Sequence, residues 1–526
     1  MKRSLVVSLF LALLAACAGN GAALDTTPQK SDVDAMRDEA YGVWKQQQLL
    51  LWDEWTQGTP ANLAETFRDH ETLFSSRTAW RLLRSMNENS DPAFQRSVRY
   101  LRRHILFEVV GYETSAQQDE LARVRNAESL KVGDQTFALS HLNTLMARET
   151  DYARRRELQQ AAGQTYANLS EAHLQLDRAV AAATKKLGFS SYLELANELR
   201  GTDLAEVSRV AEQFMNDTDP IFLAPLKQAL MTELSFEFEQ MRHADMPRLL
   251  WSVRYDKAFP QDILSTSHAV SMRQLGFSLA DMPNLRIDAD ARANKRKRPR
   301  TFPVAVPNDV RMSYLPQEGL RGWEALYHEA GHALFYVTSR APSFELQALG
   351  DQTLVYAYGF LMQSILGNPH WVKTALVRLT ADEQKSYSKY IALKRLFLAR
   401  RYAAKVMFEV AWHSNQQPDL AKLYQNLMSR AHGFRLDEVD AQRWLVDHEP
   451  FFLSAQFFRA WLLAGLMEQR LQQTFGDRWF ESKEAGAWIA AFMRKGLEPS
   501  VDELARDLGV QKIDGKALIA VLKPRL

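Results

Sequence analysis

Two histidines four residues apart, with a glutamate directly after the first, constrain this chain more than any other feature. The segment reads His-Glu-Ala-Gly-His and contains His328, Glu329 and His332. Residues i and i+4 of an α-helix share one face, so both imidazoles could hold a single Zn²⁺ ion. Glu329 would lie where it can take a proton from water and return it to a leaving amine. The spacing therefore predicts a helix that carries the chemistry of a metallopeptidase.

The residues around this segment are typical of a buried helix. Trp323, Leu326, Leu334 and Val337 are apolar at helical spacing. Gly331 is small, so another helix or a substrate backbone could come close to it. The alternative interpretation is an ordinary core helix with two incidental histidines.

The beginning of the chain is typical of an export signal. Two basic residues precede an apolar run over residues 5–14, and the sequence Leu-Ala-Ala-Cys ends at Cys17. That ending resembles the lipobox of bacterial lipoproteins, which implies a signal peptide over residues 1–16 and a lipid anchor on Cys17. Residues 17–32 are expected to form a flexible spacer, and the outer membrane, facing the periplasm, is the expected location. The alternative is a secretory signal with an incidental cysteine.

Helical periodicity dominates the mature chain. We expect an N-terminal helical region over residues 33–282 and a zinc-peptidase-like region over residues 283–526. Within the second region, β-prone runs over residues 301–306 and 310–315 predict two strands. The expected fold is mainly α, a large multi-helix body with a deep cleft and a small β-sheet next to the histidine helix. An edge strand of that sheet could hold a peptide by backbone pairing.

The charge of the chain is nearly balanced. The chain has 65 Lys and Arg against 63 Asp and Glu, a net charge of +2, which argues against nucleic acid as a partner. One local exception is a basic cluster that consists of Lys295, Arg296, Lys297, Arg298 and Arg300. A charged run of this kind predicts a solvated loop, with an anion-binding surface as the alternative.

The order of these features resembles one peptidase family. Two strands, the helix of His328 and His332, and helices to the C-terminus resemble the thimet oligopeptidase and oligopeptidase F zinc peptidases, most closely their large bacterial relatives. The resemblance is clearest over residues 300–526. It implies one Zn²⁺ per chain, with His328 and His332 as ligands and Glu329 as the general base.

The third zinc ligand of that family does not carry over. The resemblance implies a glutamate on the next helix, and Tyr356 stands at that position. A phenol with a pKa of about 10 is a poor zinc ligand at neutral pH. Asp351 and Glu345 are carboxylates that could substitute, with Glu345 expected on a connecting loop. A site with no third protein ligand is the remaining alternative.

The family also uses tyrosine hydroxyls to stabilise the oxyanion of the reaction. The matching segment of this chain, residues 448–461, contains four phenylalanines and no tyrosine. Loss of one such donor lowers the rate by roughly 10²–10³. His448 or Arg459 could replace the missing donor.

Three functions are compatible with these residues. The first is a membrane-tethered, zinc-dependent oligopeptidase that hydrolyses peptides or unfolded protein segments. The second is a catalytically degenerate lipoprotein that binds peptides or an envelope protein without cleaving them. The third is a structural lipoprotein in which the histidine helix is a relic. The retained Glu329 favours the first function, whereas Tyr356 and the phenylalanine-rich segment favour the second.

Replacing the lipidation site tests the tether. Cys17→Ala removes the sulfur that would carry the acyl chain, so the protein should move from the membrane to the soluble periplasmic fraction. Cell fractionation followed by immunoblotting measures this shift, with Ala18→Ser as a neighbouring control that keeps the cysteine. Variant protein that stays with the membrane would contradict lipidation at Cys17.

Overall fold

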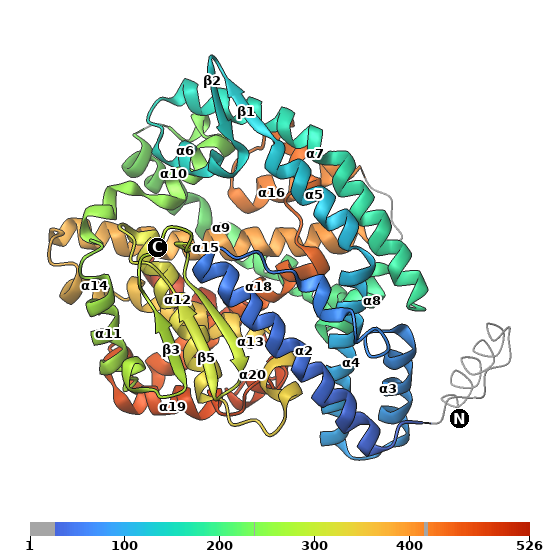
Figure 1. Ribbon diagram of the computed structural model, residues 1–526. Helices are drawn as coiled ribbons and strands as arrows, with labels where there is room; N and C mark the ends of the chain where they lie inside the picture. Colours follow the sequence, from blue (N-terminus) through green and yellow to red (C-terminus); the bar gives the residue numbers. More distant parts are fainter. Residues whose placement is uncertain (1–26, 236, 415–418) are drawn as a thin grey trace, which may run out of the picture.

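The protein is mainly α-helical, as the sequence predicts, with two small β-sheets (Figure 1). The structure is a computed structural model that describes residues 27–235, 237–414 and 419–526. The expected signal peptide and Cys17 lie outside the described residues. The last residues of the expected spacer, 30–32, already belong to the first described helix.

Long helices and one β-hairpin make up the chain before the larger sheet. In order they are α2 (Lys30–Gln57), α3 (Ser76–Glu88), α4 (Pro92–Glu113), α5 (Ser115–Ala127), β1 (Ser129–Val132), β2 (Gln135–Ala138), α6 (Leu142–Arg148), α7 (Tyr152–Lys186), α8 (Tyr192–Arg200), α9 (Leu204–Leu234), α10 (Met246–Trp251) and α11 (Leu264–Gln274). Asp91, Asp151 and Asp203 cap α4, α7 and α9 by accepting from backbone N–H groups of the first turn. The hairpin of β1 and β2 was not predicted, because strands of four residues are too short for a periodic signal.

The remaining chain begins with three strands and continues as helices. These elements are β3 (Leu285–Asp288), β4 (Arg300–Ala305), β5 (Asp309–Ser313), α12 (Leu320–Thr338), a π-helix (Glu345–Leu349), α13 (Thr353–Ser364), α14 (Pro369–Ala375), α15 (Ala381–Trp412), α16 (Leu420–His432), α17 (Glu438–Ala441), α18 (Leu453–Phe475), α19 (Lys483–Met493), α20 (Val501–Asp507) and α21 (Lys516–Leu522). The strands predicted at residues 301–306 and 310–315 are confirmed to within two residues as β4 and β5.

The larger sheet has the strand order β3-β5-β4. β4 pairs antiparallel with β5, and β3 pairs parallel with β5 on its other side. β3 was not predicted, since it has only four residues and pairs with a strand more than twenty residues later in the chain. β4 is an edge strand, which is where Pro303 is tolerated.

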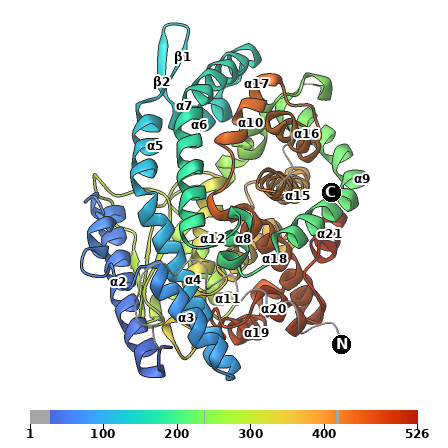
Figure 2. The ribbon, with the colours of Figure 1, turned by 90° about the vertical axis from the view of Figure 1, so that its right-hand side faces the viewer.

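The main hydrophobic core extends on both sides of residue 283. It includes buried side chains from Ala196 to Leu522, and α9 packs along α15 within it. In Figure 2, α15 is viewed close to its axis, with α9, α16 and α18 around it. Among the described residues, one helical stretch, Pro450–Phe475, is long and apolar enough to cross a membrane, but 78% of its apolar window is buried in the molecule. That burial is typical of a core helix.

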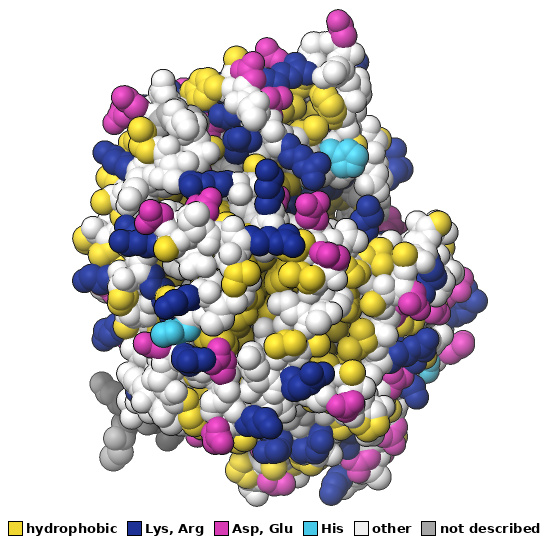
Figure 3. Space-filling view, turned by 90° about the vertical axis from the view of Figure 1, so that its left-hand side faces the viewer, with side chains coloured by type: hydrophobic (Ala, Val, Ile, Leu, Met, Phe, Trp, Pro, Cys, Tyr) yellow, Lys and Arg dark blue, Asp and Glu magenta, His cyan; other side chains and the backbone are white. Residues whose placement is uncertain are grey.

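The surface mixes charges of both signs. On the face shown in Figure 3, hydrophobic side chains gather in the middle, and Lys and Arg side chains alternate with Asp and Glu around them. This distribution agrees with the nearly balanced net charge of +2.

The close contact of α12 with α13 depends on Gly331. A Cβ atom on Gly331 would lie 2.5 Å from the backbone oxygen of Tyr358 and 2.7 Å from Cα of Gly359. Both atoms are backbone atoms in the middle of α13, so they could not easily move away. The expectation that another backbone comes close to Gly331 is confirmed.

Replacing this glycine tests the contact. Gly331→Ala should lower the free energy of unfolding by about 1–3 kcal/mol, because overpacking outweighs the higher helix propensity of alanine. Gly111→Ala is a matched control, since no atom lies within 4 Å of a Cβ at that helical position. Thermal unfolding measured by circular dichroism should separate the two variants. A Gly331→Ala protein as stable as the Gly111→Ala protein would contradict the close approach.

Candidate active site

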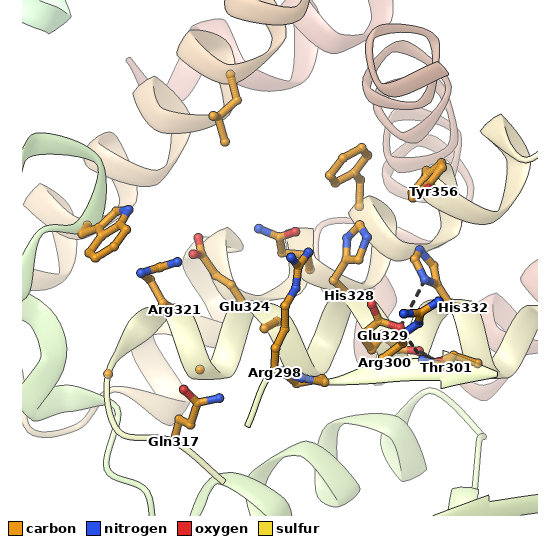
Figure 4. Close-up of a pocket in the computed structure, with 18 of the residues that line it drawn as sticks. Arg298, Arg300, Thr301, Gln317, Arg321, Glu324, His328, Glu329, His332 and Tyr356 are labelled. Carbon is orange, nitrogen blue, oxygen red and sulfur yellow. Dashed lines mark hydrogen bonds and ion pairs between the residues drawn. The ribbon is translucent and has the colours of Figure 1, made fainter. Parts of the chain in front are cut away.

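A cavity of about 1120 Å³ is lined by all three residues of the histidine motif (Figure 4). His328, Glu329 and His332 extend from α12 into this cavity, and the two imidazole ring centroids are 4.5 Å apart. The histidines therefore share one helix face, as their spacing predicts.

Two ring nitrogens of this motif, Nδ1 of His328 and Nε2 of His332, are buried and have no hydrogen-bond partner among the residues that the structure describes. A Cβ atom on Gly359 of α13 would lie 2.9 Å from the first nitrogen and 2.8 Å from the second, so both nitrogens lie close to one point. Buried polar atoms rarely lack a partner, and zinc binds histidine nitrogens at about 2.0–2.1 Å. The two rings therefore present neighbouring imidazole nitrogens, which is the donor chemistry that zinc uses.

Burial sets the protonation of the first histidine. It lowers the pKa of His328 to about 3, so the ring is neutral, which is the form that binds metals. Burial acts to raise the pKa of Glu329, but the interactions with His332 oppose it and the net pKa is lowered. Oε2 of Glu329 lies 3.3 Å from Nδ1 of His332.

Strand β4 holds Glu329 in position. The backbone N–H of Thr301 donates to Oε2 of Glu329 at 3.0 Å, and the Thr301 hydroxyl donates to the backbone oxygen of Glu329 at 3.1 Å. Nothing in the sequence marks Thr301 for this role, because the contact joins a strand and a helix that the sequence does not place together.

The side chain of Glu345 forms a buried ion pair away from the cavity. Its side chain is fully buried on the π-helix, and Oε1 accepts from Nε of Arg37 at 2.5 Å and from the hydroxyl of Ser97 at 3.0 Å. The expectation of a connecting loop at Glu345 is wrong, since the residue begins a helical turn. Glu345 is not among the residues that line the cavity.

Asp351 is also bonded elsewhere. Its Oδ2 accepts from Nη1 of Arg459 at 2.9 Å, and both side chains are buried. Its Oδ1 accepts from the backbone N–H of Thr353 at the start of α13. This ion pair also occupies Arg459, one of the two residues expected to replace the oxyanion donor.

Tyr356 is the third-ligand candidate that lies beside a histidine. Its ring centroid is 5.5 Å from that of His332, and its side chain lines the cavity. Burial raises the pKa of the Tyr356 phenol, so the hydroxyl keeps its proton at neutral pH. Over residues 27–235, 237–414 and 419–526, no three His, Cys, Asp or Glu side chains form a group that could hold a metal. The described residues therefore offer no third His, Cys, Asp or Glu beside His328 and His332.

Two tyrosine hydroxyl groups near the motif come from α13 and α15 and not from residues 448–461, the segment that the resemblance indicated. His448 does not line the cavity; its Nδ1 donates to the backbone oxygen of Leu445 at 2.6 Å. Tyr402 of α15 and Tyr356 of α13 do line it, and both pack against Phe457. Tyr402 carries no sequence signal, since it is one of many residues on a long helix.

The outer edge of β4 is already hydrogen-bonded. The N–H of Thr301 is bound by Glu329, and Pro303 has no N–H. The carbonyl oxygen of Pro303 accepts from Nε1 of Trp44 at 3.0 Å. The prediction that this edge pairs with a peptide backbone is therefore wrong over residues 301–303.

The basic cluster is divided between the interior and the cavity. Lys295 is buried, and its ammonium group donates to Oδ1 of Asp288 at 2.9 Å. Arg298 and Arg300 line the cavity. The expected uniformly solvated loop is therefore wrong for Lys295, because a buried carboxylate holds it inside.

Comparisons with known proteins add no relative. No protein-family model matches this chain, and no curated protein sequence matches it. The resemblance to the oligopeptidase group therefore depends on the residues alone.

A carboxylate in place of Tyr356 tests the third-ligand position. Tyr356→Glu should tighten zinc binding at least about tenfold, because a carboxylate would then lie beside His332 as the third ligand. Competition with a chelator measures the affinity. Tyr402→Glu is the matched control, since it adds the same charge to the same cavity at another position. Equal affinities of the two variants would contradict the assignment of Tyr356.

Proposed function

We propose that this protein is a zinc-dependent peptidase that binds peptide segments in the cavity and hydrolyses them there. The observation that supports this most strongly is the pair of buried, unpartnered nitrogens of His328 and His332 next to the Glu329 carboxylate. These two histidines would hold the metal. Zinc bound there would lower the pKa of water and polarise a substrate carbonyl group.

Glu329 moves the proton in this proposal. Its carboxylate accepts a proton from the attacking water and passes it to the leaving amine. The hydrogen bond from Thr301 fixes Oε2, and therefore the direction in which the carboxylate points.

The cavity is large enough for a peptide of several residues. Its volume of about 1120 Å³ exceeds the roughly 300–1,000 Å³ of typical small-molecule sites. Because the β4 edge is occupied, side chains would hold the peptide. The aromatic rings of Trp251, Tyr356, Phe457 and Trp461 line the cavity and offer apolar contacts.

Tyrosine hydroxyls could take the place of the missing oxyanion donors. Tyr356 keeps its proton and lies beside His332, so its hydroxyl is a donor rather than a metal ligand. Tyr402 faces the same cavity from α15. Either hydroxyl would stabilise negative charge that develops on a substrate oxygen.

A second candidate function is peptide binding without cleavage. The observation that favours it is the engagement of Glu345 and Asp351 in buried ion pairs, which occupies both carboxylates expected as a third zinc ligand. A relic site in a structural lipoprotein is the third candidate. In each case the lipid tether at Cys17 would hold the protein at the bacterial envelope.

Metal content and peptide turnover separate these functions. The mature protein, purified without added zinc, should contain about one zinc per chain, and His328→Ala should lose it. Glu329→Gln should keep the zinc and lower kcat by roughly 10²–10⁴, because only the proton carrier is removed. Elemental analysis and cleavage of a quenched fluorescent peptide library measure the two quantities.

The possible results have distinct meanings. Zinc without cleavage would favour the binding protein over the peptidase. No zinc above the His328→Ala level would exclude the zinc-dependent peptidase and leave peptide binding and the structural role as the remaining candidates.

A further inference from the structure

The cavity is lined by three arginines, Arg298, Arg300 and Arg321, of which Arg300 interacts electrostatically with Glu329 and Arg321 with Glu324. Within the described part of the chain, none of them forms an ion pair or a hydrogen bond with an acidic side chain. Their neighbour Arg296 differs, because it pairs with Glu54 outside the cavity.

Aromatic rings hold two of these guanidinium groups. Cζ of Arg321 lies 3.5 Å from the ring centroid of Trp251. Cζ of Arg300 lies 4.9 Å from the ring centroid of Trp55 and 5.0 Å from that of Phe302. Stacking occupies the face of a guanidinium group and leaves its in-plane N–H donors available. Aromatic contacts therefore hold these two guanidinium groups in place and leave N–H donors free to bind a ligand.

The acidic residues of the cavity are mostly engaged by other groups. Glu324 accepts from Nζ of Lys394 with both oxygens, at 2.9 and 2.7 Å. Asp256 accepts from the backbone N–H of Leu320 at 3.2 Å. Glu318 is exposed to solvent. Glu329, which also lines the cavity, interacts electrostatically with Arg300 but accepts its hydrogen bond from Thr301. Among the described residues, none of these carboxylates accepts a hydrogen bond from the three arginines.

Because the guanidinium groups of Arg300 and Arg321 are partly buried, binding of an anionic ligand to them is more favourable than it would be in water. Burial lowers the pKa of Arg300 and of Arg321, which means that each cation has lost part of its hydration. A carboxylate that binds two N–H groups of one guanidinium replaces that hydration with charge-assisted hydrogen bonds.

We infer that these arginines bind a carboxylate group of the peptide, so that the cavity selects acidic peptides. The inference rests on the proposed peptide-binding function. In Figure 4, Arg298 extends into the cavity between Glu324 and His328, with Arg321 on one side of it and Arg300 on the other. The carboxylate could belong to an acidic side chain or to the C-terminus of the peptide.

Binding of matched peptides tests the inference. The full chain with Glu329→Gln, which prevents turnover, is titrated with three fluorescent peptides of equal length. One has acidic side chains and an amidated C-terminus, one has neutral side chains and a free C-terminus, and one has lysine side chains and an amidated C-terminus. Fluorescence anisotropy should show at least one carboxylate peptide binding about tenfold or more tightly than the lysine peptide.

A charge-removing variant assigns the effect to the arginines. Arg298→Gln should reduce this preference to about threefold or less. Lys297→Gln is the matched control, because it removes the same charge from the adjacent position, which does not line the cavity. Its preference should stay within about twofold of that of the parent protein.

Each outcome decides the inference. Tighter binding of the amidated acidic peptide assigns recognition to side chains, and tighter binding of the free-terminus peptide assigns it to the C-terminus. Two outcomes would overturn the inference and leave the proposed function intact. In the first, peptides bind without a preference for carboxylates. In the second, the preference survives when all three arginines are replaced by Gln. If no peptide binds at all, the proposed function fails and the inference fails with it.

Discussion

The backbone contact between α12 and α13 at Gly331 and Gly359 is the constraint on which the site depends. Without side chains at these positions the helices come close enough for the rings of His328 and His332 to lie against α13. The same contact places Tyr356 of α13 beside His332. It therefore fixes both the two-histidine donor pair and the residue that stands next to it.

Buried ion pairs hold the two carboxylates that the sequence offered as a third ligand. Glu345 is held by Arg37, and Asp351 is held by Arg459, in places where water cannot replace a lost partner. Breaking a buried pair from one side costs roughly 3–5 kcal/mol, so neither carboxylate is free to move to a metal. The packing that stabilises these helices therefore also limits the chemistry of the cavity.

The same arrangement limits how a peptide could bind in the cavity. The edge of β4 is occupied by Glu329 and by the indole of Trp44, so β-pairing with a peptide is blocked there. The cavity instead presents aromatic rings and arginines, of which Arg321 is held against Trp251. Recognition in this protein would therefore rely on side-chain charge more than on backbone pairing.

The sequence by itself determined the features that depend on local spacing. Helical periodicity predicted the mainly α fold, β-prone runs predicted β4 and β5, and the i, i+4 spacing predicted that His328 and His332 share a face. Only the tertiary structure decided which residues from distant parts of the chain contact the histidine helix and the strands. Two contacts join segments that are apart in the chain: the hydrogen bond from Thr301 to Glu329 and the parallel pairing of β3 with β5. The position of Arg298 at the cavity also depends on how distant segments pack. Such contacts depend on packing, which leaves no periodic trace in the sequence.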